Sequence, residues 1–136
     1  MISVLQKQGR MPVTVISLDG RLDGQNYQEL IAKGQELHKM GVRDILLDLT
    51  NLTYVSSAGM VAFHNIAIML RGEKPPSPDE GWNAYRSMGR SSSGDGSMEH
   101  FKLFNPQADV NHILDMVGFN TIFEIFTDLD EAINSF

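Results

Sequence analysis

The sequence contains no cysteine and has fewer basic than acidic side chains. Without cysteine the chain cannot form disulfide bonds, thiolate nucleophiles or zinc sites built on cysteine. The 11 Lys and Arg residues against 17 Asp and Glu residues give a formal net charge of -6. Nucleic acid and anionic membranes attract a basic surface, so neither is expected as the main partner. A basic protein partner is compatible with this charge.

Long hydrophobic stretches are also missing. The longest apolar run lies within residues 58–70 and contains His64 and Asn65, so it is too short to cross a bilayer. The first residues lack a basic region leading into a long apolar core, so we expect no signal peptide. The length of 136 residues and the hydrophobic content of 42% suit one globular domain. We expect a cytoplasmic protein without membrane insertion.

Apolar runs and helical patterns alternate along the chain, which predicts an α/β domain with a largely parallel sheet packed against helices. Gly9 to Pro12 supplies a turn, so the first two strands are expected to form a hairpin at one edge. Gly41 and Gly118 are placed to end helices, and Asp128 with Glu131 forms a capping box. The expected strands are 2–8, 13–18, 44–49, 101–104 and 122–126. Helices are expected from about Tyr27, from Gly59 to Leu70, around Val110 to Val117, and over the last residues from about Leu129.

Residues 73–99 interrupt this alternation. Pro, Gly and Ser dominate the segment and no apolar periodicity survives. We therefore expect a long flexible loop inserted in a single domain that spans residues 1–136. A loop of this length is uncommon inside a compact domain unless it is functional or disordered.

Two serines lie in a turn of small residues, Ser56-Ser57-Ala58-Gly59, between an apolar strand and a helix. In one interpretation a serine is only the N-cap that binds free N–H groups at the helix start. In the other, a hydroxyl is displayed for phosphorylation, because the N–H groups and dipole of a helix start favour an anion. The sequence pattern alone leaves both open.

The helix after this turn has more apolar residues than a single buried stripe requires. The surplus predicts either an exposed apolar patch used for protein binding or a face covered by the terminal helix or by the 73–99 loop. These two alternatives have equal support from the sequence.

No set of residues typical of catalysis is present. Asp48 and Asp23 could frame a metal ion if the topology brought them to one rim, but such carboxylates more often bind backbone amides in turns. The histidines at 38, 64, 100 and 112 lack metal-binding spacing, and GxSxG is absent. We therefore expect a binding module that is not an enzyme and has no metal or cofactor.

Several motifs resemble the STAS domain, the fold of bacterial anti-sigma factor antagonists. Asp48-Leu-Thr followed by Tyr54-Val-Ser-Ser-Ala-Gly-Met60 is similar to the family signature, which usually reads Asp-Leu-Ser and then Asp-Ser-Ser-Gly with Leu or Met. Gly20-Arg-Leu-Asp23 resembles the family's Gly-x-Leu-Asp. Further likeness lies at Asn105-Pro106, Gly118-Phe119 and 122–133, so the resemblance covers about 1–71 and 100–136.

This resemblance implies a mixed sheet of about four to five strands packed against about four helices. It also implies phosphorylation of Ser57, with Ser56 as the alternative, by a serine kinase that is itself the anti-sigma factor, and reversal by a Ser/Thr phosphatase. Ser56 stands in place of the usual Asp, and Ala58 in place of the second Ser. The expected partner-binding residues are Asp23, Ser56, Ser57, Ala58, Gly59, Met60 and Phe63.

Two further expectations concern partners. STAS modules also act in lipid-transport and stress-signalling assemblies, so the alternative function is an unphosphorylated adaptor that uses its apolar second helix. A weak homodimer is compatible with the sequence. We expect no binding to nucleic acid.

Overall fold

Five strands form one mixed sheet in the order β1-β2-β3-β4-β5 in the computed structural model, which describes residues 2–72 and 99–136. The first two strands are an antiparallel hairpin, and the remaining neighbours pair in parallel, as the alternating sequence predicted. The strands are β1 (Ile2–Gln8), β2 (Pro12–Leu22), β3 (Ile45–Val55), β4 (Phe101–Phe104) and β5 (Ile125–Phe126).

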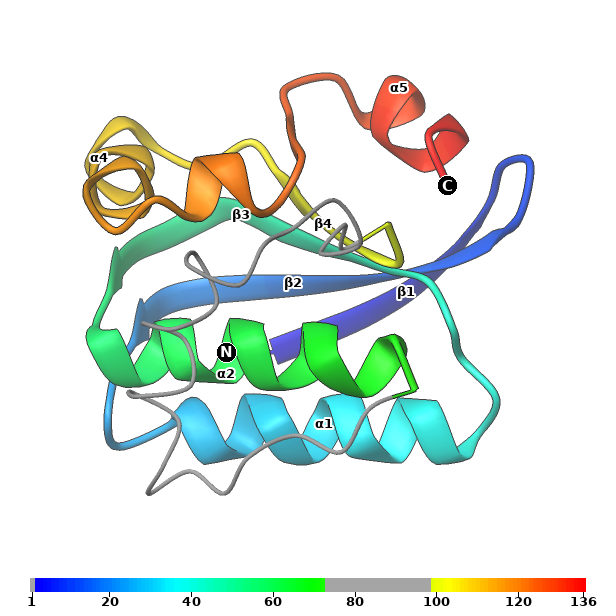
Figure 1. Ribbon diagram of the computed structural model, residues 1–136, viewed down its shortest axis with the longest axis horizontal. Coiled ribbons are helices and arrows are strands. Elements are labelled where there is room, and N and C mark those ends of the chain that lie inside the picture. Colours follow the sequence, from blue (N-terminus) through cyan, green and yellow to red (C-terminus); the bar gives the residue numbers. More distant parts are fainter. Residues whose placement is uncertain (1, 73–98) are drawn as a thin grey trace.

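The helices lie on both sides of this sheet. Figure 1 shows α1 and α2 side by side beneath it. The buried residues of α4 belong to the same core cluster as those of α1 and α2, whereas α5 packs on the other face through a separate cluster. This arrangement confirms the expected α/β fold of a mixed sheet packed against about four helices. The helices are α1 (Tyr27–Lys39), α2 (Ser57–Leu70), α4 (Ala108–Met116) and α5 (Leu129–Asn134), and a short 3-10 helix, η1, spans Phe119–Thr121.

Alternation along β3 separates the core into two parts. Ile45, Leu47 and Leu49 belong to the large cluster that contains the buried residues of α1 and α2. Leu46 belongs instead to a smaller cluster with Ala132 and Ile133 of α5. Since successive side chains of a strand point to opposite faces, one strand contributes to both parts of the core.

The predicted helix ends are confirmed. Gly41 and Gly118 have φ of 101° and 82°, a left-handed conformation that glycine adopts without steric cost. The side chain of Asp128 accepts a hydrogen bond from the N–H of Glu131 at 2.9 Å, so it is the N-cap of α5.

One strand prediction was too long. Only Ile125–Phe126 of the expected strand 122–126 pairs with β4. The chain before it turns through η1, and Phe123 is buried with its ring edge-on to Phe101 and Phe119, at centroid distances of 5.4 and 5.2 Å. Aromatic rings favour such edge-to-face contacts, and this packing leaves little chain to extend the strand.

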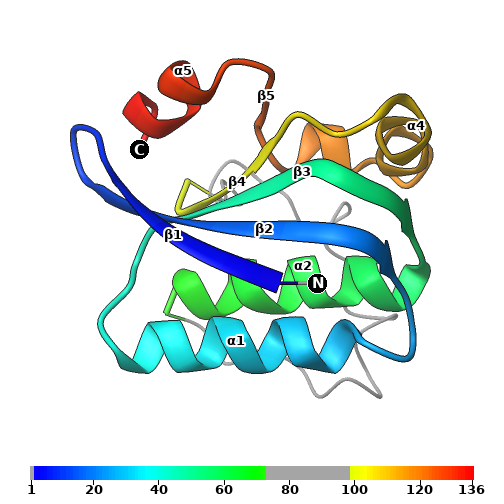
Figure 2. The ribbon, with the colours of Figure 1, turned by 180° about the vertical axis from the view of Figure 1, so that it is seen from behind.

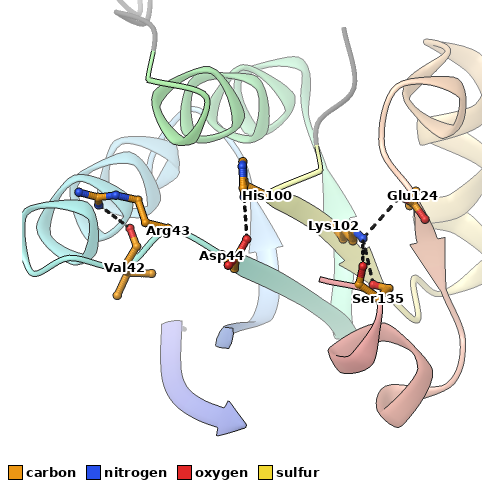
Figure 3. A network of polar contacts seen from close by, with 7 residues as sticks. All are labelled: Val42, Arg43, Asp44, His100, Lys102, Glu124 and Ser135. Carbon is orange, nitrogen blue, oxygen red and sulfur yellow. Dashed lines mark hydrogen bonds and ion pairs between the residues drawn. The ribbon is translucent and has the colours of Figure 1, made fainter. Parts of the chain in front are cut away.

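A buried lysine holds the C-terminal helix against the sheet. Lys102, 3% exposed in β4, donates hydrogen bonds from Nζ to the backbone oxygen and the Oγ of Ser135, at 2.9 and 3.0 Å (Figure 3). The same Nζ lies 3.5 Å from the Glu124 carboxylate and 4.7 Å from the centre of the Phe136 ring. These contacts offset the free-energy cost of removing the ammonium group from water, which would be large for an unpaired buried charge.

A second polar pair joins the strands where β3 and β4 begin. Nδ1 of His100 lies 2.7 Å from Oδ1 of Asp44, and the N–H of Ile45 donates to the backbone oxygen of His100 at 2.9 Å (Figure 3). Asp44 is buried while His100 is partly exposed. The pair therefore helps to fix the register of β3 with β4.

Two sequence expectations concern longer stretches of chain. Within residues 2–72 and 99–136, no helix is long and apolar enough to cross a membrane. The expected loop 73–99 lies outside the described residues except for Glu99.

Candidate functional site

Parallel pairing brings the ends of β2 and β3 to the same edge of the sheet. Leu22 at the end of β2 is in register with Val55 at the end of β3. Beyond this pair, the N–H of Ser56 donates to the backbone oxygen of Leu22 at 2.9 Å. Asp23 and the two serines thus follow neighbouring strand ends, where ligands and partners of open α/β sheets commonly bind.

Two irregularities in β3 set the direction in which the chain leaves the sheet. The register with β2 shifts between Ser17 and Asp19 and again between Gly20 and Arg21, and at each shift β3 contains one residue more than β2. A bulge of this kind bends its strand and increases the local twist. The end of β3 curves toward the helix layer, which places the serine turn at the start of α2 (Figure 1).

The two serines have different roles in the turn. Ser56 is the N-cap of α2: its Oγ accepts from the N–H of Gly59 at 3.3 Å, and its backbone oxygen accepts from the N–H of Met60 at 3.0 Å. Ser57 is the first helical residue and is exposed. In the described part of the chain its hydroxyl makes no hydrogen bond. The cap interpretation therefore applies to Ser56, and Ser57 displays the free hydroxyl.

Gly59 allows α2 to begin directly above the strand ends. A Cβ at this position would lie 2.7 Å from Cγ2 of Val55 and 2.9 Å from Cγ of Leu22. Real Cβ atoms essentially never approach other heavy atoms so closely. Both neighbours are stiff, since one atom belongs to a β-branched side chain and the other is a branch point. The glycine of the turn is thus required for close packing of α2 on the strand ends.

A Gly59→Ala variant should be less stable than the wild type by about 2 kcal/mol. Overpacking a core destabilises a protein by roughly 1–3 kcal/mol. This loss exceeds the gain of up to about 1 kcal/mol that alanine gives over glycine in a helix. Urea unfolding followed by circular dichroism measures the change. Gly24→Ala is the matched control, because a Cβ there meets nothing within 4 Å. Equal stability of the two variants would contradict the packing role.

Asp23 lies beside the serines in a tightly bonded loop. Its Oδ1 accepts from the N–H of Gln25 at 3.0 Å, and its backbone oxygen accepts from the N–H of Tyr27 at 3.0 Å. Asn26 closes the loop, accepting from the N–H of Asp23 and donating to the backbone oxygen of Arg21. Asp23 is half-buried and follows Leu22 at the end of β2, just as the serines follow Val55 at the end of β3.

Burial removes three of the expected partner-binding residues from the surface. Phe63 is 0% exposed and its ring faces that of Phe101 at 6.4 Å, while Met60 is 4% exposed and Gly59 is also buried. These residues support the turn from beneath, because helical spacing directs them into the core. Asp23, Ser56 and Ala58 are half-buried and Ser57 is exposed, so these four remain available for contact.

Of the two alternatives for the apolar surplus of α2, the exposed patch is not found. Every residue from Gly59 to Leu70 is buried except Ile68, which is half-buried. The terminal helix α5 does not provide the cover, since it packs on the opposite face of the sheet. The other cover considered, the 73–99 loop, lies outside the described residues apart from Glu99.

Asp48 is separate from this site. It pairs in register with Ser17, seven residues before the end of β3, which corresponds to about 20 Å along a strand. Its carboxylate accepts from Ser17 Oγ and from the N–H and Oγ1 of Thr50, at 3.2, 3.0 and 2.6 Å. The two aspartates therefore do not frame a metal ion, and each binds backbone amides, as the simpler alternative predicted. No group of three possible ligands occurs within residues 2–72 and 99–136.

Sequence reasoning missed one feature near the turn. The guanidinium carbon of Arg21 lies 4.5 Å from the centre of the Tyr54 ring, and both side chains are exposed at neighbouring positions of β2 and β3. Only the register shift brings these two residues opposite each other, so no local pattern could reveal the pair. Arg and Tyr are common among the residues that dominate binding energy at protein interfaces.

Comparison with protein families agrees with the geometry of this turn. The STAS domain family matches residues 4–74, which include β1 to α2 and the serine turn. The chain belongs to the STAS domain family. A comparison with curated proteins finds no match.

Solved structures with the same fold are anti-sigma factor antagonists. One, from Mycobacterium paratuberculosis, has a TM-score of 0.63 and 14% sequence identity. The match covers 99% of this chain and 93% of the mycobacterial chain. The anti-sigma factor antagonist SpoIIAA in its unphosphorylated form has a TM-score of 0.58 and 16% sequence identity. The match covers 97% of this chain and 94% of the SpoIIAA chain. The phosphorylated form of SpoIIAA, a Bacillus cell fate determinant, gives 0.50 and 16%, covering 97% of each chain. At these identities the likeness establishes the fold, so this STAS domain has the architecture of an anti-sigma factor antagonist.

Proposed function

We propose that this STAS domain is an anti-sigma factor antagonist switched by phosphorylation of Ser57. The unmodified protein would bind a serine-kinase anti-sigma factor, and phosphorylated protein would be released until a Ser/Thr phosphatase restores the hydroxyl. The observation that carries the proposal is the exposed, unbonded hydroxyl of Ser57 at the first position of α2. In this role the chain is a substrate and a binding partner in the cytoplasm, and it is not itself an enzyme.

Two features favour a phosphate at this position. The free N–H groups and the dipole of a helix start stabilise a negative charge. In addition, the first turn of α2 contains no acidic residue, because Ser56 occupies the place where the family usually has Asp. Serine caps a helix about as well as aspartate, so the replacement keeps the cap and removes a charge that would repel the phosphate.

Release of the partner follows from charge. A phosphoserine carries about two negative charges at neutral pH, and burying them in a contact made for a neutral hydroxyl costs several kcal/mol unless new cations pair with them. The half-buried Asp23 beside the turn adds to the local negative potential. Phosphorylation would therefore oppose association without any change of fold.

The direct test is phosphorylation by a purified serine-kinase anti-sigma factor and ATP, read by intact mass and fragment spectra. We expect one phosphoryl group, located on Ser57, and none on Ser57→Ala. The matched variant is Ser56→Ala, which loses the N-cap bond and about 1 kcal/mol of stability but keeps the acceptor hydroxyl. Phosphate on Ser56, or unchanged phosphorylation of Ser57→Ala, would overturn the assignment.

The adaptor function has less support. It would bind partners through the apolar surface of α2, and that surface is buried. Co-purification with transport or stress-signalling subunits in the absence of any phosphorylation would favour it over the switch.

A further inference from the structure

The two edges of the sheet differ in how they end. The β5 edge is only two residues long, and a very short edge strand is one way in which proteins prevent unwanted pairing. The β1 edge is seven residues long and almost entirely exposed. Figure 2 shows β1 in front of β2, with no described helix or strand drawn over it.

Within the described residues, β1 has few of the usual protections of a sheet edge. Its register with β2 runs without a bulge from Ile2 against Leu18 to Gln8 against Pro12. The strand ISVLQKQ contains no proline and one charged residue, Lys7. Val4 and Leu5 are 40% and 55% exposed, one on each face. A long, regular and partly apolar edge of this kind is a template for pairing with another strand.

The hydrogen bonds show which residues of β1 point outward. The N–H of Thr14 in β2 donates to the backbone oxygen of Asp44 at 3.0 Å, so it points away from β1. Thr14 and its partner Gln6 in β1 therefore form a pair without hydrogen bonds between them, and the backbone groups of Gln6 point outward. These positions alternate along an antiparallel pair. No backbone hydrogen bond joins β1 to a described residue outside the hairpin. The residues with outward N–H and C=O groups are therefore Ile2, Val4, Gln6 and Gln8.

We propose that β1 pairs antiparallel with β1 of a second copy of this chain, centred on Leu5. In this register Val4 faces Gln6 of the second copy and Ile2 faces Gln8, so all four outward residues gain hydrogen-bonded partners. Shifting the centre by one residue in either direction leaves one of them unpaired. A strand edge is its own complement under a twofold axis, which favours a second copy over a foreign strand.

Side chains support the same register. The two Leu5 residues form a non-hydrogen-bonded pair, the arrangement in which facing side chains come closest, and together they cover apolar surface that is 55% exposed in one copy. Lys7 lies opposite Ser3 of the second copy, so the lysines stay apart, whereas parallel pairing would place Lys7 against Lys7. The assembly stops at two copies, because the other edge of the described sheet is the two-residue β5.

Light scattering at increasing concentration tests the association. Over roughly 10 µM to 1 mM, the range of weak complexes, the mass should rise from 15.2 kDa toward twice that value. Leu5→Lys places like charges directly opposite each other and should hold the mass at that of one chain. Met40→Lys, which changes another strongly exposed hydrophobic residue outside β1, should dimerise as the wild type does. A mass independent of concentration in the wild type would overturn the proposal.

Disulfide trapping tests the register, since the wild type has no cysteine. In Leu5→Cys the two Cα atoms would lie about 4.5 Å apart, within disulfide range, so oxidised glutathione should link the copies. In Lys7→Cys the two cysteines would be about 13 Å apart along the strands, and linking should be at least tenfold slower. Equal rates for the two variants, or faster linking at position 7, would overturn the Leu5-centred pairing.

Discussion

A Ser57→Asp variant should bind the serine-kinase anti-sigma factor roughly 100-fold more weakly than the wild type. The substitution places a permanent negative charge at the exposed first position of α2, beside Asp23. Like charges brought together in an interface, or a charge that loses water without gaining a partner, cost several kcal/mol. Isothermal titration calorimetry or surface plasmon resonance with the purified kinase gives the affinities.

The same variant should fold at least as stably as the wild type, which separates the binding effect from damage to the structure. A carboxylate in the first turn of a helix stabilises it by roughly 0.3–1 kcal/mol at low salt. Ser57→Asn is the matched control, because its side chain has nearly the same shape without the charge and should bind much more tightly than the aspartate variant. Equal affinities of the Asp and Asn variants would contradict release by charge.

Folding stability should fall as the pH is lowered from about 7 to about 4, in part because of His64. This residue is 4% exposed on α2, and desolvation lowers its pKa from 6.5 to about 4. Between these values the unfolded chain binds a proton that the folded chain rejects, so the contribution of His64 to stability is present above pH 6.5 and is lost toward pH 4. The shift corresponds to about 3 kcal/mol at most.

Urea unfolding of the wild type and a His64→Leu variant at several pH values measures this contribution. Leucine is similar in size and does not titrate. The contributions of the acidic groups that both proteins share therefore cancel in the difference between the two stability curves. The difference should change in favour of the leucine variant as the pH falls. His112→Leu, at an exposed position of α4, should follow the wild type. Parallel curves for wild type and His64→Leu would exclude a buried neutral histidine.

Sequence reasoning predicted the architecture because the strands and helices have clear local patterns. The hairpin, the alternation from β2 to α2 and the glycines at the helix ends were all legible in consecutive residues. Prediction of β3 stopped at Leu49, although the strand continues to Val55. The polar pair Thr50-Asn51 interrupts the apolar run there, and a bulge shifts which residues face the core. Alternation, the main signal for a strand, fails where the register changes.

The sequence predicted a turn of small residues between a strand and a helix, but not the role of each residue in that turn. The turn of small residues predicted Ser56 and Ser57, yet only the backbone shows that the first is the cap and the second is displayed. Met60 and Phe63 were expected to bind a partner, yet both are buried, because a motif gives residue order and not the direction of a side chain. The need for Gly59 comes from Val55 and Leu22, and Leu22 is far away in sequence. Such contacts depend on tertiary packing, which a local pattern does not contain.

The two additional residues of β3 have a consequence for the tolerance of this chain to deletions. Because side chains alternate along a strand, removing one residue between Asn51 and Tyr54 would exchange the inner and outer faces of everything up to α2. Val55 would turn to solvent, and the serine turn that follows it would lose its present orientation. Thr53 is exposed and can be replaced by another residue that suits the surface, whereas Leu52 is buried in the core, and neither of them can be omitted. The length of this segment, more than its chemistry, determines which way the serine turn faces.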